Sequence, residues 1–187
     1  DALPICWFRA ILDAKEIIDA FWLSLALGLA SATVAVALAV PAALATVRYR
    51  FPGRGVVMGF FLSPLMIPHV VLGVAFLRFF STLGFTGSFV WLALTHVVVV
   101  MPYAVRLVLA AATGLDSDAE RAALSLGASR FTAFRRVVLP LILPGVVGGW
   151  MLAFIQSFDE LTMTIFVSTP GTTTLPVAMY NQIAHTI

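Results

Sequence analysis

The sequence has very little charge. Only 11% of its 187 residues are Asp, Glu, Lys or Arg, whereas 61% are hydrophobic. A soluble domain usually carries about 25% charged residues, so this chain cannot cover a water-facing surface and lipid must be the solvent for much of it. The formal net charge is only +2, and the arginines lie in short clusters rather than along one face. This pattern gives no indication of nucleic-acid binding.

The sequence has a single cysteine and no nucleotide-binding motif. Cys6 is the single cysteine, which excludes an intrachain disulfide and a cysteine-based metal site. No Gly-x-x-x-x-Gly-Lys-Ser/Thr run occurs, so we expect no cofactor and no ATP site in this chain. A membrane-embedded enzyme would need a metal cluster, paired acids or a nucleophile with its base. The three histidines lie in separate segments, so we expect that the chain is not an enzyme.

Four long apolar stretches predict an all-α, polytopic membrane helical bundle. The first, residues 21–47, carries no charge and would form about 40 Å of helix at ~1.5 Å per residue, enough to cross a ~30 Å hydrocarbon core with tilt. Pro64 and Pro68 predict a kink in the second stretch. Residues 175–187 are too short to span and predict a re-entrant or interfacial segment on the outer side. The other three stretches are residues 55–81, residues 88–113 and about residues 141–158.

Small residues recur in the first stretch at steps of three and four. Such a stripe allows another helix to approach closely, so we expect this face to pack inside the bundle. Its members are Ser24, Gly28, Ser31, Ala35, Ala39, Ala42 and Thr46.

The arginines between the stretches predict the orientation of the chain. Cytoplasmic loops carry an excess of Lys and Arg, which places the first and third interhelical loops in the cytoplasm and the N-terminal segment outside. The first loop carries Arg48, Arg50 and Arg54, and the third carries Arg121, Arg130, Arg135 and Arg136, whereas residues 81–88 carry no charge.

The third loop, residues 114–140, has structure of its own. Ser117 and Glu120 fit a capping box, and the helix that follows should end at Gly127, the residue type suited to a left-handed cap. Ser129 can cap a second short helix before Pro140 leads into the fourth span. These features predict a rigid cytoplasmic knob, or alternatively a loop helix that lies on the lipid headgroups.

The residues of this loop resemble the EAA loop of permeases from binding-protein-dependent ATP-binding cassette importers. That pattern has Glu-Ala-Ala, three residues, Gly, nine residues and Ile-x-Leu-Pro. Anchored on Gly127, its alanines fall on Ala122 and Ala123, its Leu-Pro falls on Leu139 and Pro140, and Val137 replaces the Ile. The glutamate of the pattern falls on Arg121, with Glu120 one place earlier. This shift leaves open whether Glu120 or Arg121 makes the polar contact of the motif.

The resemblance implies a fold and a set of partners. It implies a single MetI-like transmembrane domain over residues 1–187, the core spans of a six-span subunit with flanking spans outside both ends of this sequence. The segment from Glu120 to Leu126 would be a coupling helix that docks on a dimer of ATP-binding subunits. A second permease subunit, homologous or identical, and a periplasmic substrate-binding protein would complete an importer in the bacterial inner membrane.

Three segments near the C-terminal end are similar to the spermidine/putrescine branch of these permeases: residues 157–160, 166–171 and 175–180. Permeases for iron(III), opines, amino-acid-like and other small solutes share much of this pattern. Intramembrane acids are candidates for function, so Asp159 and Glu160 could meet a polyammonium solute. They could instead pair locally, for instance with Arg78. We expect His69 and His96 to be core or helix-contact residues. A secondary transporter or channel, the more distant alternative, should show repeated halves or a polar filter.

Overall fold

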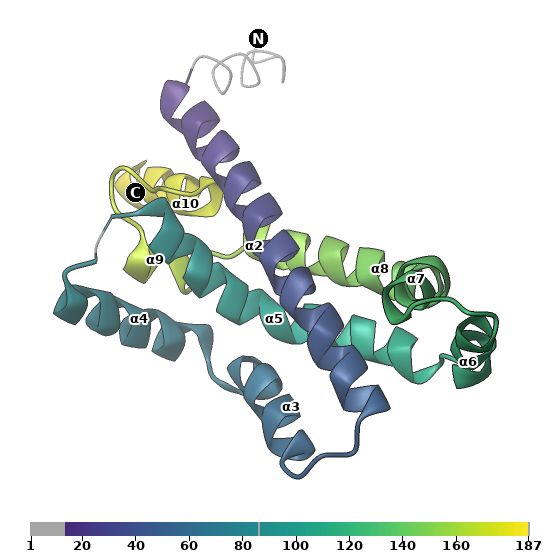
Figure 1. The fold of residues 1–187 in the computed structure, drawn as a ribbon. Coiled ribbons are helices and arrows are strands. Elements are labelled where there is room, and N and C mark those ends of the chain that lie inside the picture. The colour runs from purple at the N-terminus through teal and green to yellow at the C-terminus, as the bar shows by residue number, and fades with distance from the viewer. Residues whose placement is uncertain (1–13, 86, 187) are drawn as a thin grey trace.

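Residues 14–85 and 87–186 are described in a computed structural model, in which helices are joined by short loops (Figure 1). The part of the chain before residue 14, including Cys6, lies outside the described residues. The long helices are α2 (Lys15–Arg48), α5 (Phe89–Thr113) and α8 (Leu139–Phe158), and they pack against one another as the core of an all-α bundle. The remaining elements are α3 (Arg54–Leu62), the 3₁₀ turn η1 (Ser63–Met66), α4 (His69–Leu83), α6 (Ser117–Ser125), α7 (Arg130–Ala133), the π-helical segment η2 (Phe134–Val138), α9 (Thr164–Val167) and α10 (Leu175–Thr186).

The stripe of small residues on α2 faces the inside of the bundle, as predicted. Ser31, Ala35 and Ala39 are fully buried. Ala42 is only half-buried, and its neighbour Ala43 lies in the core instead. Small side chains let α5 and α8 approach α2 closely, so dispersion contacts between backbones hold the three helices together.

Glycines of α8 allow a close approach to α5. A Cβ atom added to Gly145 would lie 2.4 Å from the Cβ of Ala111 and 2.8 Å from the carbonyl oxygen of Leu107, both on α5. Gly149, one turn later, faces Ala104 of α5 in the same way, at 3.3 Å from its carbonyl oxygen. The α5–α8 crossing therefore exists because these two positions have no side chain.

Buried polar side chains tie the bundle together in the half that holds α9 and α10. His96 of α5 is fully buried, with Nδ1 2.8 Å from the hydroxyl of Ser157 and Nε2 3.0 Å from that of Thr164. It is thus the core histidine that the sequence predicted. The backbone N–H of Leu175 donates to the hydroxyl of Ser24 at 2.7 Å, which anchors the start of α10 to α2.

The kink predicted in the second apolar stretch is present and amounts to a break in the helix. The helix pair Arg54–Met66 and His69–Leu83 is bent by 103° at the break between them. Ile67 precedes a proline and has φ −97° and ψ 127°, because the ring of Pro68 disfavours the helical region for the residue before it. Pro68 itself is extended, with ψ 134°, and α4 begins after it. The described residues therefore hold three helices long enough to span, or four if the bent pair is one broken span.

The fourth span differs from its prediction, since it does not begin at Pro140. The helix is continuous from Arg130 to Phe158, a length of 29 residues. Within it, Leu139 donates its N–H to the carbonyl of Phe134 five residues earlier, the hydrogen bond of a π-helix. Proline lacks an N–H and its ring crowds the carbonyl four residues before it. The wider π turn ahead of Pro140 accommodates both effects, so the proline lies within the helix instead of starting it.

Candidate functional site

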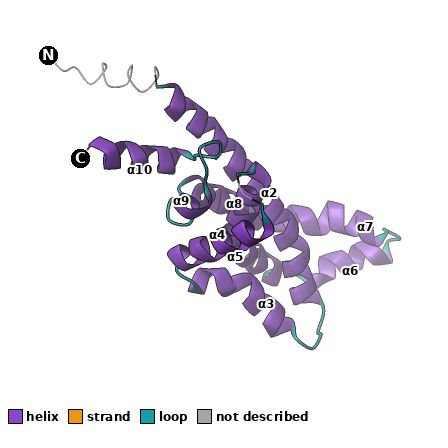
Figure 2. Cartoon of the chain, turned by 90° about the vertical axis from the view of Figure 1, so that its left-hand side faces the viewer, coloured by secondary structure: helices purple, strands orange, loops and turns teal. Residues whose placement is uncertain are grey.

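The loop of residues 114–140 projects from one end of the bundle as a knob of two short helices, α6 and α7, at the opposite end from α10 (Figure 2). The α6 helix begins one residue earlier than the predicted capping box requires. Asp116 is its N-cap and accepts a hydrogen bond from the N–H of Asp118 at 2.9 Å. One carboxylate oxygen of Glu120 is directed toward Arg48 at the end of α2.

Gly127 ends α6 in the conformation that the sequence predicted. Its φ of 87° lies in the left-handed region, which glycine adopts without the steric cost of a Cβ atom. The N–H of Gly127 donates to the carbonyl of Leu124 at 3.0 Å, and that of Ala128 to the carbonyl of Ala123 at 3.1 Å. These two bonds form a Schellman motif. The motif fixes the angle between α6 and the helix that follows.

The second helix of the knob begins at its predicted cap. The hydroxyl of Ser129 accepts a hydrogen bond from the N–H of Thr132 at 3.2 Å. Leu126 and Phe131, on either side of the break, are 88% and 70% exposed. In contrast Val138, further along, is buried against Leu44, Ala112 and Ile142. The knob thus has a packed base and an apolar, solvent-facing tip.

The two candidates for the polar contact of the loop have different partners within the chain. Glu120 forms an ion pair with Arg48 at the end of α2, with Arg48 Nη2 2.5 Å from Glu120 Oε2. Arg121 forms an ion pair with Asp118 within α6, at 2.7 Å, and both side chains are more than 70% exposed. Ala122 and Ala123 lie on the same helix and leave its side narrow. Glu120 therefore connects two elements of the bundle, while Arg121 stays on the outer surface of α6.

The acids at the C-terminal end of α8 lie in different environments. Asp159 is exposed at the C-cap of the helix, while Glu160 is 7% exposed. One carboxylate oxygen of Glu160 accepts the N–H of Met163 at 2.6 Å, and the other lies 2.8 Å from Nδ1 of His69. The local partner of Glu160 is therefore His69 and not Arg78, and through this bond His69 contacts another element of the bundle. Together, Glu160 and His69 join the break in the second span to the corner after α8.

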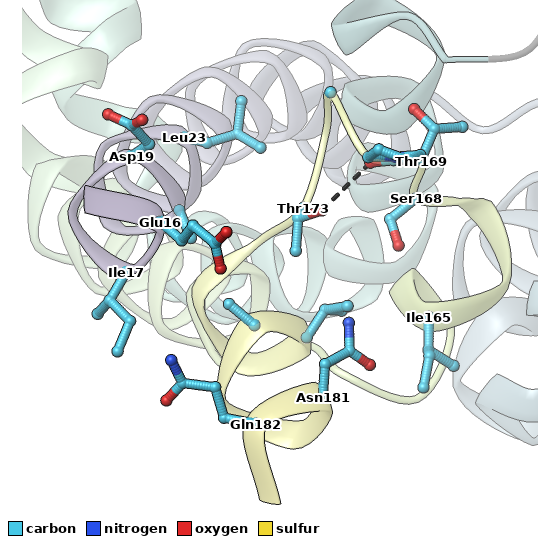
Figure 3. Close-up of a pocket in the computed structure, with 15 residues that line it drawn as sticks. Glu16, Ile17, Asp19, Leu23, Ile165, Ser168, Thr169, Thr173, Asn181 and Gln182 are labelled. Carbon is cyan, nitrogen blue, oxygen red and sulfur yellow. Dashed lines mark hydrogen bonds between the residues drawn. The ribbon is translucent and has the colours of Figure 1, made fainter. Parts of the chain in front are cut away.

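A cavity of about 1010 Å³ opens beside the start of α2, at the end of the bundle that holds α10. Figure 3 shows Glu16 and Asp19 on its α2 side, Asn181 and Gln182 on α10, and Thr169 and Thr173 on the turn between α9 and α10. Thr173 donates its hydroxyl hydrogen to the carbonyl of Thr169 at 3.2 Å, which holds that turn closed. The lining contains two carboxylates and several neutral polar groups, but no Lys, Arg or His among the described residues.

Several of these pairings could not be predicted from the sequence because the partners are distant in the chain. Arg48 and Glu120 are 72 positions apart, and His69 and Glu160 are 91 apart. The acids of the cavity, Glu16 and Asp19, were not among the residues singled out from the sequence. Their place three residues apart near the start of a helix put them on one face, a signal that could have identified them.

Comparison with known proteins is consistent with these features. Residues 35–186 match the family described as binding-protein-dependent transport system inner membrane component. The chain is 33% identical over 177 residues to the spermidine/putrescine transport system permease protein PotC of Escherichia coli K12. That alignment covers 95% of this chain and 67% of PotC. It is 33% identical over 186 residues to the putrescine transport system permease protein PotI of the same organism, covering 95% and 66%. The molybdenum transport system permease protein ModB, also from E. coli K12, is 35% identical over 187 residues, covering 89% and 82%.

Proposed function

This chain belongs to the family of binding-protein-dependent transport system inner membrane components, and we propose that it helps to move an organic polycation of the spermidine or putrescine type. Membership of the family makes it an inner-membrane permease subunit of an ATP-binding cassette importer and not an enzyme. Such a subunit works with a separate ATPase and with a substrate-binding protein.

The charge of the outer cavity supports a polycation. The names of the relatives include both polyamines and molybdenum, so the names alone do not choose a solute. Glu16 and Asp19 line the cavity without a basic side chain among the described lining residues. A cavity lined by one sign of charge concentrates ions of the opposite sign and repels ions of the same sign. A polyammonium chain would be attracted here, whereas an oxyanion would be repelled.

Asp159 is the second acid that we assign to the solute pathway. Its carboxylate is exposed at the end of α8, where it could exchange contacts with a passing ammonium group. We assign Glu160 a supporting role, because both of its oxygens already have partners in the protein. It would set the position of the corner that carries Asp159.

The solute assignment can be tested in proteoliposomes that contain the full permease complex, its ATPase and its binding protein. We expect ATP-dependent uptake of labelled spermidine or putrescine, and we expect Glu16→Gln with Asp19→Asn to reduce it severalfold. Lys15→Gln is the matched control, since Lys15 adjoins Glu16 but does not line the cavity, and it should leave uptake close to normal. Binding of neither polyamine by the binding protein would refute the assignment, and uptake driven by an ion gradient without ATP would refute the importer class.

We assign α6 as the coupling helix that docks on the ATPase. The support is its shape: a capped helix with alanines on a narrow side, ended by a glycine and followed by an exposed apolar tip. The knob lies in the basic third loop, which the positive-inside rule puts in the cytoplasm with the first loop. The same rule puts the start of α2 outside. A second permease subunit, identical or homologous, would complete the pathway.

Replacing Gly127 with leucine tests the coupling assignment. No atom lies within 4 Å of the position that its Cβ would occupy, so the new side chain would project outward toward the docked partner. Gly53 is a matched control, because it has a φ of 86°, similarly open space and a place in the other basic loop. We expect Gly127→Leu to separate ATP hydrolysis from uptake, while Gly53→Leu carries the same backbone strain and keeps them linked. Normal uptake by Gly127→Leu would overturn the assignment.

A further inference from the structure

We propose that Arg48, at the end of α2, is a positioning residue that transmits movement of α6 to the membrane spans through its ion pair with Glu120. The proposal rests on the assignment of α6 as the coupling helix. It adds that force reaches the bundle by two routes, one along the continuous helix from Arg130 and one through this ion pair to α2.

The ion pair is placed to act between elements. Glu120 is on the coupling helix and Arg48 is the last residue of α2, and their side chains are 24% and 30% exposed. Partial burial reduces the solvent screening of the two charges. The ion pair between Arg121 and Asp118 differs on both counts, because its side chains are mostly exposed and both belong to α6. That pair cannot transmit movement from one helix to another.

The ion pair is the main connection between α6 and α2 in the described part of the chain. A cavity of about 260 Å³ is lined by Arg48, Glu120, Leu44, Leu115 and Leu141, together with other residues at the cytoplasmic ends of the spans. The α6 helix packs on α7 and the π segment, while no extensive packing joins it to α2 in the described part of the chain. The ion pair therefore bridges α6 and α2 beside a space that apolar contacts do not fill.

The α2 helix, which carries Arg48, is packed closely against the rest of the bundle. Along most of its length α2 packs on α5 and α8, with the small-residue stripe buried between them. A displacement of the end of α2 must therefore be shared by both neighbouring helices, since close-packed interfaces transmit movement instead of absorbing it.

The position of the acid in the loop explains why its carboxylate reaches α2. The pattern that the loop resembles keeps its glutamate at the place of Arg121, whereas this chain has its acid one residue earlier. One residue turns the side chain by about 100° around a helix. That rotation takes the carboxylate away from the outer surface, where Arg121 lies, and aims it at α2.

Charge exchange tests the proposal in the full complex, with uptake and ATP hydrolysis measured in the same proteoliposomes. Arg48→Glu and Glu120→Arg each place like charges together, and we expect each to lower uptake per ATP hydrolysed about two- to fivefold, the range for a partly exposed pair. The double variant restores the attraction in reverse and should return the ratio to near its original value. A double variant no better than the weaker single variant would overturn the proposal, as would single variants with an unchanged ratio.

Further variants separate this result from general effects of charge or assembly. Arg50→Glu changes the same charge in the same loop, two residues from Arg48, and should leave the ratio unchanged. An equal loss in Arg50→Glu would attribute the effect to loop charge and overturn the proposal. If charge reversal prevents assembly, Arg48→Gln, Glu120→Gln and their combination replace it. The combination should then be no worse than one single variant, because both remove the same interaction, and additive losses would overturn the proposal.

The coupling assignment and this proposal fail in different ways. If α6 did not dock on the ATPase, Gly127→Leu would keep normal uptake. If α6 docked but Arg48 played no part, Gly127→Leu would still separate hydrolysis from uptake, while the charge exchange would restore nothing.

Discussion

Substitution of Gly145 by alanine should separate two helices of the core. The new Cβ would lie 2.4 Å from the Cβ of Ala111 and 2.8 Å from the carbonyl oxygen of Leu107. Carbon atoms in contact prefer about 3.5–4.0 Å, so α5 and α8 would have to move apart by roughly 1 Å. Neither neighbouring atom is the end of a flexible side chain, which means that rotamer changes cannot relieve the overlap.

The expected cost follows from this rigidity. Overpacking a well-packed core usually costs about 1–3 kcal/mol, and we expect Gly145→Ala to fall at the upper end because both close contacts involve backbone or Cβ atoms. Gly148 offers a matched control in the same helix. A Cβ there would find its nearest neighbour, Leu107 Cδ1, at 3.8 Å, an ordinary contact. Gly148→Ala should therefore be neutral or slightly stabilising, since alanine is the better helix former by up to about 1 kcal/mol.

Thermal unfolding of the purified permease complex in detergent measures the difference. We expect a clearly lower Tm for Gly145→Ala than for the unmodified protein, and a Tm equal to or above it for Gly148→Ala. Membrane abundance of the two variants should follow the same order. Equal Tm values for the two alanine variants would refute the close packing of α5 and α8 described here.

Further substitutions test three other contacts. His96→Ala should destabilise the complex by about 1–3 kcal/mol, because two buried hydroxyl groups lose their hydrogen-bond partner; a Tm unchanged from that of the unmodified protein would contradict this. Glu160→Gln should cost about 1.5–3 kcal/mol in stability through the loss of charged hydrogen bonds, and His69→Gln should add little to it in the double variant, whereas additive losses would show that the two side chains do not interact. Gly73→Ala should lower the Tm, since its Cβ would lie 3.1 Å from a backbone oxygen, while Gly59→Ala, with open space around it, should not; a Tm for Gly73→Ala equal to that for Gly59→Ala would argue against the packing of α4 on α9.

Elements that depend on residues close together in the sequence could be predicted from local patterns. The uncharged stretch of residues 21–47 predicted α2, and its small residues predicted the buried face. Gly127 and Ser129 predicted a break and a cap within the third loop, because a left-handed glycine and an N-terminal hydroxyl act on their own neighbours. The α6 boundary was wrong by one residue, since Asp116 and Ser117 are both good caps and only the backbone conformation separates them.

Features that depend on contacts between residues far apart in the sequence could not be predicted from local patterns. The proline pair predicted a kink, but a bend of 103° also depends on where α4 packs, against α9 at the far end of the chain. His69 looked like an isolated histidine because Glu160 is far from it in sequence. The three glycines of α8 at positions 145, 148 and 149 looked alike in the sequence, and only the structure shows which of them faces a backbone.

The unbroken helix from Arg130 to Phe158 has a mechanical consequence. It joins the tip of the knob to the far end of the fourth span without an intervening loop. At about 1.5 Å per residue, 29 residues make a lever roughly 43 Å long. A tilt of about 5° at the knob, without bending, would carry the far end sideways by ~4 Å, because displacement grows with that length. Asp159 lies directly after that far end, so a small rotation of the knob would be enlarged at the residue that we propose for the solute pathway.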